Sequence, residues 1–223
     1  MPVDDNYTVS LLHFNGTDTA TTFTDESGKA WTANGNAQLD TAQSVFGGAS
    51  GLFDGTGDYI TTPDSADFDV AGGNFTVDFW VRFNSLAATN TIFSHRTDGN
   101  NVHRLTVSTG GKLQYEVYSA GVAIVSVLGT NGDVTTATWY HIALVRNGTS
   151  WVIYKNGVSA ATATDADSVP NYTGTFQIGA ENGATNLNGW MDEFRFSKGV
   201  ARWTTGFTPP SIEYSGSGFL MFF

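Results

Sequence analysis

The sequence predicts an all-β protein, an antiparallel β-sandwich of two sheets arranged as a jelly roll. Composition is the first observation that predicts it. The 223 residues include 26 Gly and 16 Phe but only 10 Lys and Arg together, which favours strands and tight turns over helices. The second observation is a series of short apolar runs separated by turn residues, without helical periodicity. The third is a pair of Asn-Gly turns, placed one strand apart.

Alternation is clearest in residues 75–83, where every second side chain is apolar. One face carries Phe75, Val77, Phe79, Val81 and Phe83, and the other carries Thr76, Asp78, Trp80 and Arg82. A period of two residues is the signature of a strand. We expect the apolar face to pack in the core and the other face to be partly solvated.

An antiparallel meander is predicted for residues 140–158. The run 140–146 is followed by Asn147-Gly148, and the run 151–155 by Asn156-Gly157. Asn-Gly supplies the positive φ angles of a type I′ hairpin turn. Further strands are expected at 9–14, 51–53, 59–61, 91–94, 104–108, 112–118, 123–128, 175–178 and 189–196, and short helical pieces at 65–68 and 198–202.

We expect one domain over residues 1–223, because no linker or charge run divides the chain. The apolar segments 11–14 and 219–222 are expected to be terminal strands that close the sheet. The alternative is that the C-terminal segment begins a second unit or forms an oligomer contact, since Phe219–Phe223 would be an awkward surface if exposed.

Charge narrows the classes of partner. The formal net charge is −11, whereas contact with nucleic-acid phosphates needs a basic stripe. The chain has no cysteine, which excludes disulfides and thiolate metal sites. Residues 1–7 are polar and acidic, so we expect no encoded signal peptide. No stretch is long enough to cross a membrane.

A series of motifs suggests a family. In chain order they are Leu11-Leu12-His13-Phe14-Asn15-Gly16, Asp25-Glu26-Ser27-Gly28, Phe53-Asp54-Gly55-Thr56-Gly57-Asp58-Tyr59-Ile60, Phe75-Thr76-Val77-Asp78-Phe79-Trp80-Val81, Trp139-Tyr140-His141-Ile142-Ala143-Leu144-Val145-Arg146, Val152-Ile153-Tyr154-Lys155-Asn156-Gly157, Phe176-Gln177-Ile178-Gly179 and Gly189-Trp190-Met191-Asp192-Glu193-Phe194-Arg195. Each is weak alone. Their order and spacing over residues 9–210 resemble the laminin-G-like jelly-roll modules of the concanavalin A-like lectin/glucanase superfamily.

The end of the chain refines that resemblance. Residues 192–203 and Thr208-Pro209-Pro210 look like versions of this module in phage and marine bacterial proteins. The resemblance implies a virion or extracellular-surface protein, with host attachment as its role.

Asp192 is the carboxylate that we single out. In a regular strand over 189–196 it shares a face with Trp190, Phe194 and Phe196, so it is predicted to point toward the apolar side. A buried carboxylate needs hydrogen bonds, an arginine or a metal, and calcium prefers such oxygen ligands.

The resemblance places Asp25 in the turn beside this strand. We therefore predict a structural calcium shared by Asp25 and Asp192. The alternative is an Asx turn at Asp25 and backbone N–H donors to Asp192.

A hydrolase is the least favoured function. Glycosidases use two carboxylates that flank the scissile bond, and the Glu-x-Asp-x-x-Glu motif of the related β-glucanases is absent. The glutamates are scattered, at Glu26, Glu116, Glu181, Glu193 and Glu213. We therefore expect no enzyme.

Sugar binding needs exposed aromatic rings beside polar groups. Candidate outward-facing rings are Trp80, Tyr118 and Trp151. The predicted ligand rim consists of His95, Arg96, Asp98, Asn100 and Tyr172.

The sequence thus predicts a non-catalytic, lectin-like carbohydrate-binding module whose partner is a glycan or cell-surface polysaccharide. The alternative is a capsid-decorating or tail-associated protein that acts through virion protein contacts or as a homo-oligomer. A glycoside hydrolase of the same fold is the third possibility.

Overall fold

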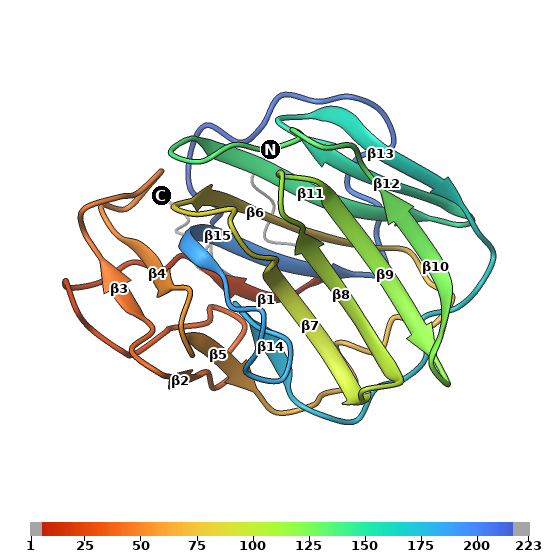
Figure 1. Cartoon of the computed structure of the whole chain (residues 1–223), viewed down its shortest axis with the longest axis horizontal. Coiled ribbons are helices and arrows are strands. Elements are labelled where there is room, and N and C mark those ends of the chain that lie inside the picture. Colours follow the sequence, from red (N-terminus) through yellow and green to blue (C-terminus); the bar gives the residue numbers. More distant parts are fainter. Residues whose placement is uncertain (1–5, 216–223) are drawn as a thin grey trace, which may run out of the picture.

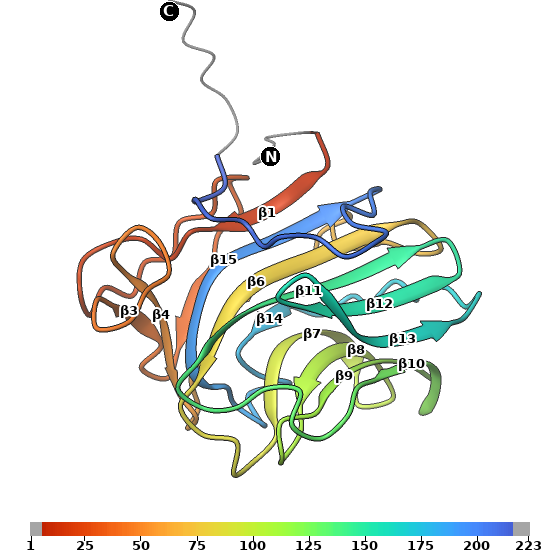
Figure 2. The same ribbon diagram turned by 90° about the horizontal axis from the view of Figure 1, so that it is seen from above.

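The computed structural model describes residues 6–215 and is a sandwich of two antiparallel sheets (Figures 1 and 2). Its strands are β1 (Thr8–Leu12), β2 (Thr32–Asn34), β3 (Gln38–Asp40), β4 (Ser50–Asp54), β5 (Tyr59–Thr62), β6 (Phe75–Phe83), β7 (Asn90–Asp98), β8 (Asn101–Val107), β9 (Leu113–Ser119), β10 (Val122–Leu128), β11 (Trp139–Asn147), β12 (Ser150–Lys155), β13 (Val158–Thr164), β14 (Phe176–Ile178) and β15 (Asn188–Lys198). The predicted fold class is confirmed.

The two sheets interleave strands that are distant in sequence. An eight-stranded sheet has the order β13-β12-β11-β6-β15-β4-β3, and β1 pairs with β15 outside this path. A seven-stranded sheet has the order β10-β9-β8-β7-β14-β5-β2. Figure 2 shows the two sheets as stacked layers. The inner faces of both sheets contribute to one hydrophobic cluster.

Strand β6 behaves as its alternation predicts on the inner face. Its five alternate apolar side chains, from Phe75 to Phe83, are fully buried in the core cluster. On the outer face, Trp80 and Arg82 are half-buried, but Thr76 and Asp78 are fully buried. Residues 199–215, which we call the strap, contribute to this burial, since Thr76 Oγ1 donates to the Val200 carbonyl and the strap crosses this sheet (Figure 2).

The meander is confirmed, with one correction to its first turn. Asn156 and Gly157 both have positive φ, 49° and 77°, as a type I′ turn requires. In the first hairpin Asn147 pairs with Ser150, so the turn residues are Gly148 and Thr149. Only Gly148 has a positive φ, 60°, which is the pattern of a type II′ turn.

A β-bulge in β15 corrects the predicted orientation of Asp192. The pairing of β15 with β6 shifts between Asp192 and Arg195, and Glu193 has a positive φ of 52°. The extra residue reverses the alternation. Met191 therefore joins Phe194 and Phe196 in the core, whereas Asp192 lies on the outer face and is still fully buried.

Other expectations for local structure have mixed outcomes. The segment 65–68 is a turn and 198–202 contains no helix. Strand β1 pairs with β15, so the N-terminal strand is confirmed; the segment 219–222 lies outside the described residues. No helix within residues 6–215 is long and apolar enough to cross a membrane.

Candidate functional site

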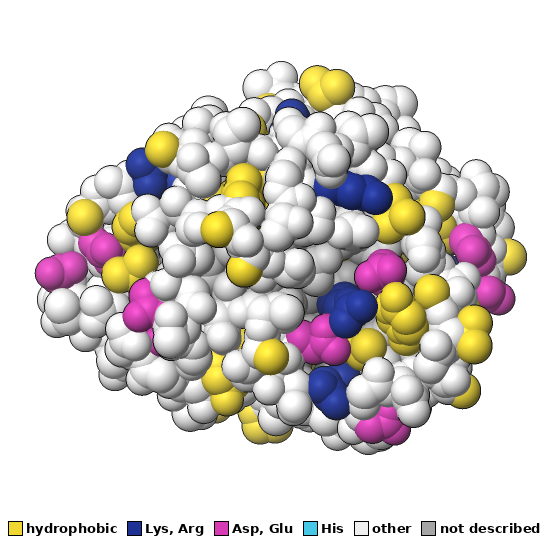
Figure 3. All heavy atoms as spheres, viewed as in Figure 1, with side chains coloured by type: hydrophobic (Ala, Val, Ile, Leu, Met, Phe, Trp, Pro, Cys, Tyr) yellow, Lys and Arg dark blue, Asp and Glu magenta, His cyan; other side chains and the backbone are white. Residues whose placement is uncertain are grey.

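A polar groove lies on the outer face of the seven-stranded sheet. It has a volume of about 290 Å³ and is lined by Thr89, Arg104, Thr106, Gln114, Glu116, Glu181 and Thr185. We call it the Arg104 groove. Figure 3 shows charged side chains of both signs gathered over this sheet. Its lining therefore combines one cation, two carboxylates, one amide and three hydroxyls.

Strand alternation places these side chains on the surface. His103 and Leu105 of β8 are fully buried, so Arg104 between them points outward. Tyr115 and Val117 of β9 are likewise fully buried, which turns Glu116 outward. Because Arg104 pairs directly with Glu116 across the two strands, the cation and the carboxylate meet on one face.

Arg104 is held in place by three neighbours. Its Nη1 donates to Glu181 at 2.5 Å and its Nη2 donates to Glu116 at 3.4 Å. The guanidinium also lies 5.1 Å from the centre of the Tyr118 ring, and the Tyr118 hydroxyl donates to Glu116. Burial lowers the pKa of Arg104, but Glu181 and Glu116 outweigh it and raise the pKa above its usual value. The guanidinium is therefore a fixed, ion-paired feature of the groove.

Two buried polar atoms near the groove lack a protein hydrogen-bond partner among the described residues: Arg104 Nε, a donor, and Gln177 Oε1, an acceptor. They belong to one cross-strand row, because Gln177 pairs with Ser94 and Ser94 pairs with Arg104. Native proteins rarely leave buried polar groups unpaired. Because both atoms are buried, a ligand on the open face of the groove would not contact them directly, and the candidate site rests on the side chains that line the groove.

Chemically, the groove is suited to hydroxyl groups. Carboxylates accept hydrogen bonds from hydroxyls, and guanidinium and amide N–H groups donate to them. Glu116 and Glu181 both accept hydrogen bonds from the Arg104 guanidinium. A carboxylate that accepts hydrogen bonds from an arginine is poorly suited to donate a proton to a scissile glycosidic bond. The arrangement supports binding rather than hydrolysis.

Two residues of the predicted ligand rim are in the core, and for these the prediction is wrong. His95 and Tyr172 are each 1% exposed. His95 Nε2 lies 2.9 Å from the Gly174 carbonyl, and the Tyr172 hydroxyl donates to the Tyr118 carbonyl. Tyr172 also stacks on the ring of His103. Inward alternation along β7 takes His95 away from the surface.

Of the other three rim residues, Arg96 and Asp98 lie near the end of β7 and Asn100 lies in the turn that leads to β8. Arg96 is half-buried, and Asp98 and Asn100 are exposed. Asp98 accepts hydrogen bonds from the Asn100 backbone and the Asn101 side chain, and these bonds lower its pKa. Its carboxylate therefore shapes the turn. A ligand role for these three residues stays a prediction.

Of the three rings predicted to face outward, two do so and one is buried. Tyr118 lies beside the Arg104 groove as expected, and Trp80 is half-buried on the outer face of the eight-stranded sheet. Trp151, by contrast, is fully buried in the core cluster. There its ring stacks on Tyr115.

Asp25 is saturated by hydrogen bonds within the protein. Its Oδ1 accepts from the backbone N–H groups of Leu11 and Ser27, and its Oδ2 accepts from Ser10 Oγ and Trp31 Nε1. The Ser27 contact is the Asx turn of the alternative interpretation. Four donors occupy the lone pairs that a cation would need, so Asp25 does not fit the role of a calcium ligand.

Asp192 has one free oxygen. Its Oδ2 accepts from the backbone N–H groups of Val45 and Phe46, whereas Oδ1 is buried without a partner among the described residues. Burial raises the pKa of Asp192 to about 7. Within residues 6–215, no group of three or more His, Cys, Asp or Glu side chains is arranged for a metal ion. Of the predicted pair, Asp192 is therefore the carboxylate with an oxygen left to bind a cation.

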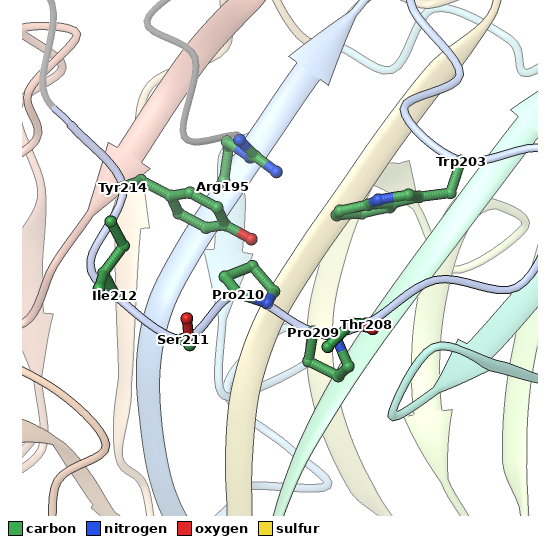
Figure 4. A pocket seen from close by; sticks show the side chains of 8 residues that line it. All are labelled: Arg195, Trp203, Thr208, Pro209, Pro210, Ser211, Ile212 and Tyr214. Carbon is green, nitrogen blue, oxygen red and sulfur yellow. The ribbon is translucent and has the colours of Figure 1, made fainter.

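A second pocket, of about 340 Å³, lies between the strap and β15 (Figure 4). Its rings come from Trp203, Pro209, Pro210 and Tyr214, and Arg195 is its charged residue. Arg195 donates twice to the fully buried Asp78, at 3.0 and 3.2 Å. Although burial alone would raise the pKa of Asp78, Arg195 and His141 lower it to about 2. The Tyr214 hydroxyl of the strap donates to Asp78, and the Arg195 guanidinium lies 3.7 Å from the centre of the Tyr214 ring, so this ion pair serves to attach the strap. We take the more polar Arg104 groove as the candidate site.

Sequence reasoning did not single out Arg104, Glu116 or Glu181. The alternation of apolar and polar residues around Arg104 and Glu116 is visible in the sequence and predicts that both side chains point outward. The pairing of β8 with β9 is a hairpin between consecutive strands, whereas the approach of Glu181 from the loop after β14 depends on tertiary structure.

The two-sheet jelly roll with this strand order defines a class, the concanavalin A-like β-sandwiches. A family profile described as the Laminin_G_3 domain, Concanavalin A-like lectin/glucanases superfamily, matches residues 54–204. The chain belongs to this superfamily. No curated protein matches the sequence.

Solved structures share the fold at low sequence identity. Domain 4 of AbnA, a GH43 extracellular arabinanase from Geobacillus stearothermophilus, in complex with arabinotriose, has a TM-score of 0.67 and 20% identity, covering 87% of this chain and 94% of that domain. The binding domain of Botulinum Neurotoxin DC in complex with SialylT has a TM-score of 0.64 and 17% identity, covering 87% and 49%. The binding domain of Paraclostridial Mosquitocidal Protein 1 has a TM-score of 0.65 and 15% identity, and the match covers 87% of this chain and 50% of that one. The chain thus spans about half of each toxin domain, and at these identities the likeness concerns the fold.

Proposed function

We propose that this protein is a non-catalytic carbohydrate-binding domain and that the Arg104 groove is its binding site. The observation that carries the proposal is the groove itself, in which two carboxylates, a fixed guanidinium, an amide and hydroxyls converge on one open face. Such a set matches the donors and acceptors of sugar hydroxyls. The adjacent Tyr118 ring offers an apolar surface for a sugar ring.

The comparisons support a sugar ligand. The arabinanase domain was solved with arabinotriose and the neurotoxin domain with SialylT. Both complexes use the same sandwich fold as this chain, and the toxin proteins are described as binding domains. The superfamily also contains glucanases, so the absence of turnover is part of the proposal.

The setting that we propose is an extracellular or virion surface, where the domain attaches to a host glycan. The relative in an extracellular arabinanase supports the extracellular part. The phage part rests on the resemblance of residues 192–210. Detection of the protein on purified particles that lose host adsorption without it would support attachment, and its absence from any particle would contradict it.

Binding is tested with an oligosaccharide panel that includes arabinotriose, by calorimetry and by an array. We expect Arg104→Ala to weaken binding by roughly tenfold or more, because it removes the centre of the hydrogen-bond set. Arg82→Ala is the matched control, since Arg82 is half-buried on the outer face of the other sheet and stacks on Trp190. Equal binding by wild type and Arg104→Ala would reject the groove. Reducing-end release from any glycan of the panel would reject the non-catalytic role.

A further inference from the structure

The charge balance of the Arg104 groove has consequences for which sugars it accepts. The lining residues contain one cation, Arg104, and two carboxylates, Glu116 and Glu181. When all three are ionised, the groove has a net charge of −1. The whole chain adds to this with a formal net charge of −11. The local and the long-range potential are therefore both negative.

The guanidinium that an acidic sugar would need is already engaged. Glu181 binds Nη1 at 2.5 Å and Glu116 binds Nη2 at 3.4 Å. The carboxylate of a sialic or uronic acid would have to displace one of them. The displaced glutamate would then lie unpaired beside two other negative charges, in a partly buried site where such repulsion is poorly screened.

A neutral sugar meets no such obstacle. Glu116 and Glu181 each have two carboxylate oxygens, with more lone pairs than the guanidinium occupies. A sugar hydroxyl can donate to one of these oxygens while a neighbouring hydroxyl accepts from the amide of Gln114, which also lines the groove. Neither bond breaks an existing ion pair.

We propose that the Arg104 groove binds uncharged glycans and discriminates against sialylated and uronic-acid-containing ones. The two glutamates act as the specificity-determining residues: they fix the guanidinium and repel anionic ligands. This inference rests on the proposed function, since it concerns the ligand class of the same groove.

The test uses matched pairs of glycans that differ only by one sialic or uronic acid, alongside neutral arabino-oligosaccharides, at low and at high salt. We expect the neutral member of each pair to bind roughly tenfold more tightly at low salt. The difference should shrink as salt screens the repulsion.

Glu181→Gln changes the charge of the groove with little change of shape. We expect it to narrow the neutral-to-acidic ratio several-fold, because the guanidinium loses its closest anion and becomes available to an acidic sugar. Asp167→Asn is the matched control, since it removes one negative charge from an exposed position outside the groove. Its ratio should equal that of wild type, and melting temperatures should confirm that both variants are folded.

The outcomes separate the two proposals. If acidic glycans bind as tightly as their neutral partners, or more tightly, the groove binds sugars but the inferred selectivity is overturned. If Glu181→Gln leaves the ratio unchanged, the glutamates do not determine it. If no glycan of either class binds, the proposed function fails and the selectivity fails with it.

Discussion

At the scale of single residues, Asp192 shows what burial does to one carboxylate. It is fully buried, one oxygen accepts two backbone hydrogen bonds, and the other has no partner among the described residues. Burial outweighs the two hydrogen bonds and raises its pKa to about 7. A group whose pKa is higher in the folded state binds its proton more tightly there. Its contribution to stability is therefore lost as pH rises from about 4 to about 7.

Asp192→Asn should remove this dependence. We expect the free energy of unfolding of the variant to rise relative to that of wild type between pH 4 and pH 7, by up to about 1.4 kcal/mol per pH unit. Urea denaturation in the presence of a chelator measures it. A constant difference across this range would show that Asp192 does not titrate as described.

The same variant tests calcium. If a cation binds Asp192, calcium should raise the melting temperature of wild type at pH 8, because the ion stabilises the charged carboxylate. The variant should not respond. A wild-type melting temperature that is identical in calcium and in chelator would count against the metal, and direct metal analysis of the purified protein would settle its identity.

The sequence predicted the burial of Asp192 but not its direction. The prediction assumed unbroken alternation over residues 189–196. The bulge adds one residue at Glu193, so the residues before it face the opposite side from the one predicted. Bulges carry no strong sequence signal here, because neither Asp192 nor Glu193 is a glycine. The same limit applies to His95, whose inward position follows from the register of β7 rather than from its polarity.

At the scale of elements, hairpins were predictable and long-range pairings were not. The turn at Asn156 and Gly157 was correctly placed, because the chemistry of a type I′ turn is local. Strand β15 pairs with β1, β4 and β6, and no turn signal encodes those partners. In the Arg104 groove, Arg104 and Glu116 meet within the β8–β9 hairpin, whereas Glu181 comes from the loop after β14, and that long-range approach has no sequence signal.

Two glycines in matched hairpins separate backbone strain from steric contact. Gly148 and Gly157 both have positive φ, 60° and 77°. A Cβ on Gly148 would meet no atom within 4 Å, whereas one on Gly157 would lie 1.7 Å from the Phe207 carbonyl of the strap. The Gly157 carbonyl also accepts a hydrogen bond from the Phe207 backbone.

We expect Gly148→Ala to lower stability by roughly 1–3 kcal/mol, the cost of holding alanine at the positive φ of a type II′ turn. Gly157→Ala should cost more and should displace the strap, which would increase protease cleavage near Phe207. Chemical denaturation and limited proteolysis measure the two effects. Equal losses and equal cleavage in both variants would mean that the strap does not depend on this contact.

At the scale of the whole molecule, the buried histidines change the stability of the fold with pH in the direction opposite to Asp192. His95 and His103 lie between the sheets, 1% and 0% exposed. Burial lowers the pKa of both, most strongly that of His103, although Asp64 partly offsets the effect at His95. A group whose pKa is depressed when folded must take up a proton on unfolding. Stability is therefore lost as pH falls below the ordinary histidine value of about 6.5.

Replacing His103 isolates this acid-side loss. His103 Nδ1 lies 3.0 Å from the Tyr115 hydroxyl, and in His103→Asn an amide takes the place of that nitrogen. The smaller side chain should lower stability at every pH because it leaves a cavity. That loss is independent of pH, so the informative quantity is the slope of the free energy of unfolding against pH between pH 6.5 and pH 4.5, which should decrease by up to about 1.4 kcal/mol per pH unit.

His13→Asn is the control, because His13 lies at the surface edge and its pKa is raised by Glu193 despite partial burial. Its removal should therefore leave the slope below pH 6.5 unchanged. An unchanged slope in His103→Asn would show that the sandwich opens at acid pH without charging its buried histidines.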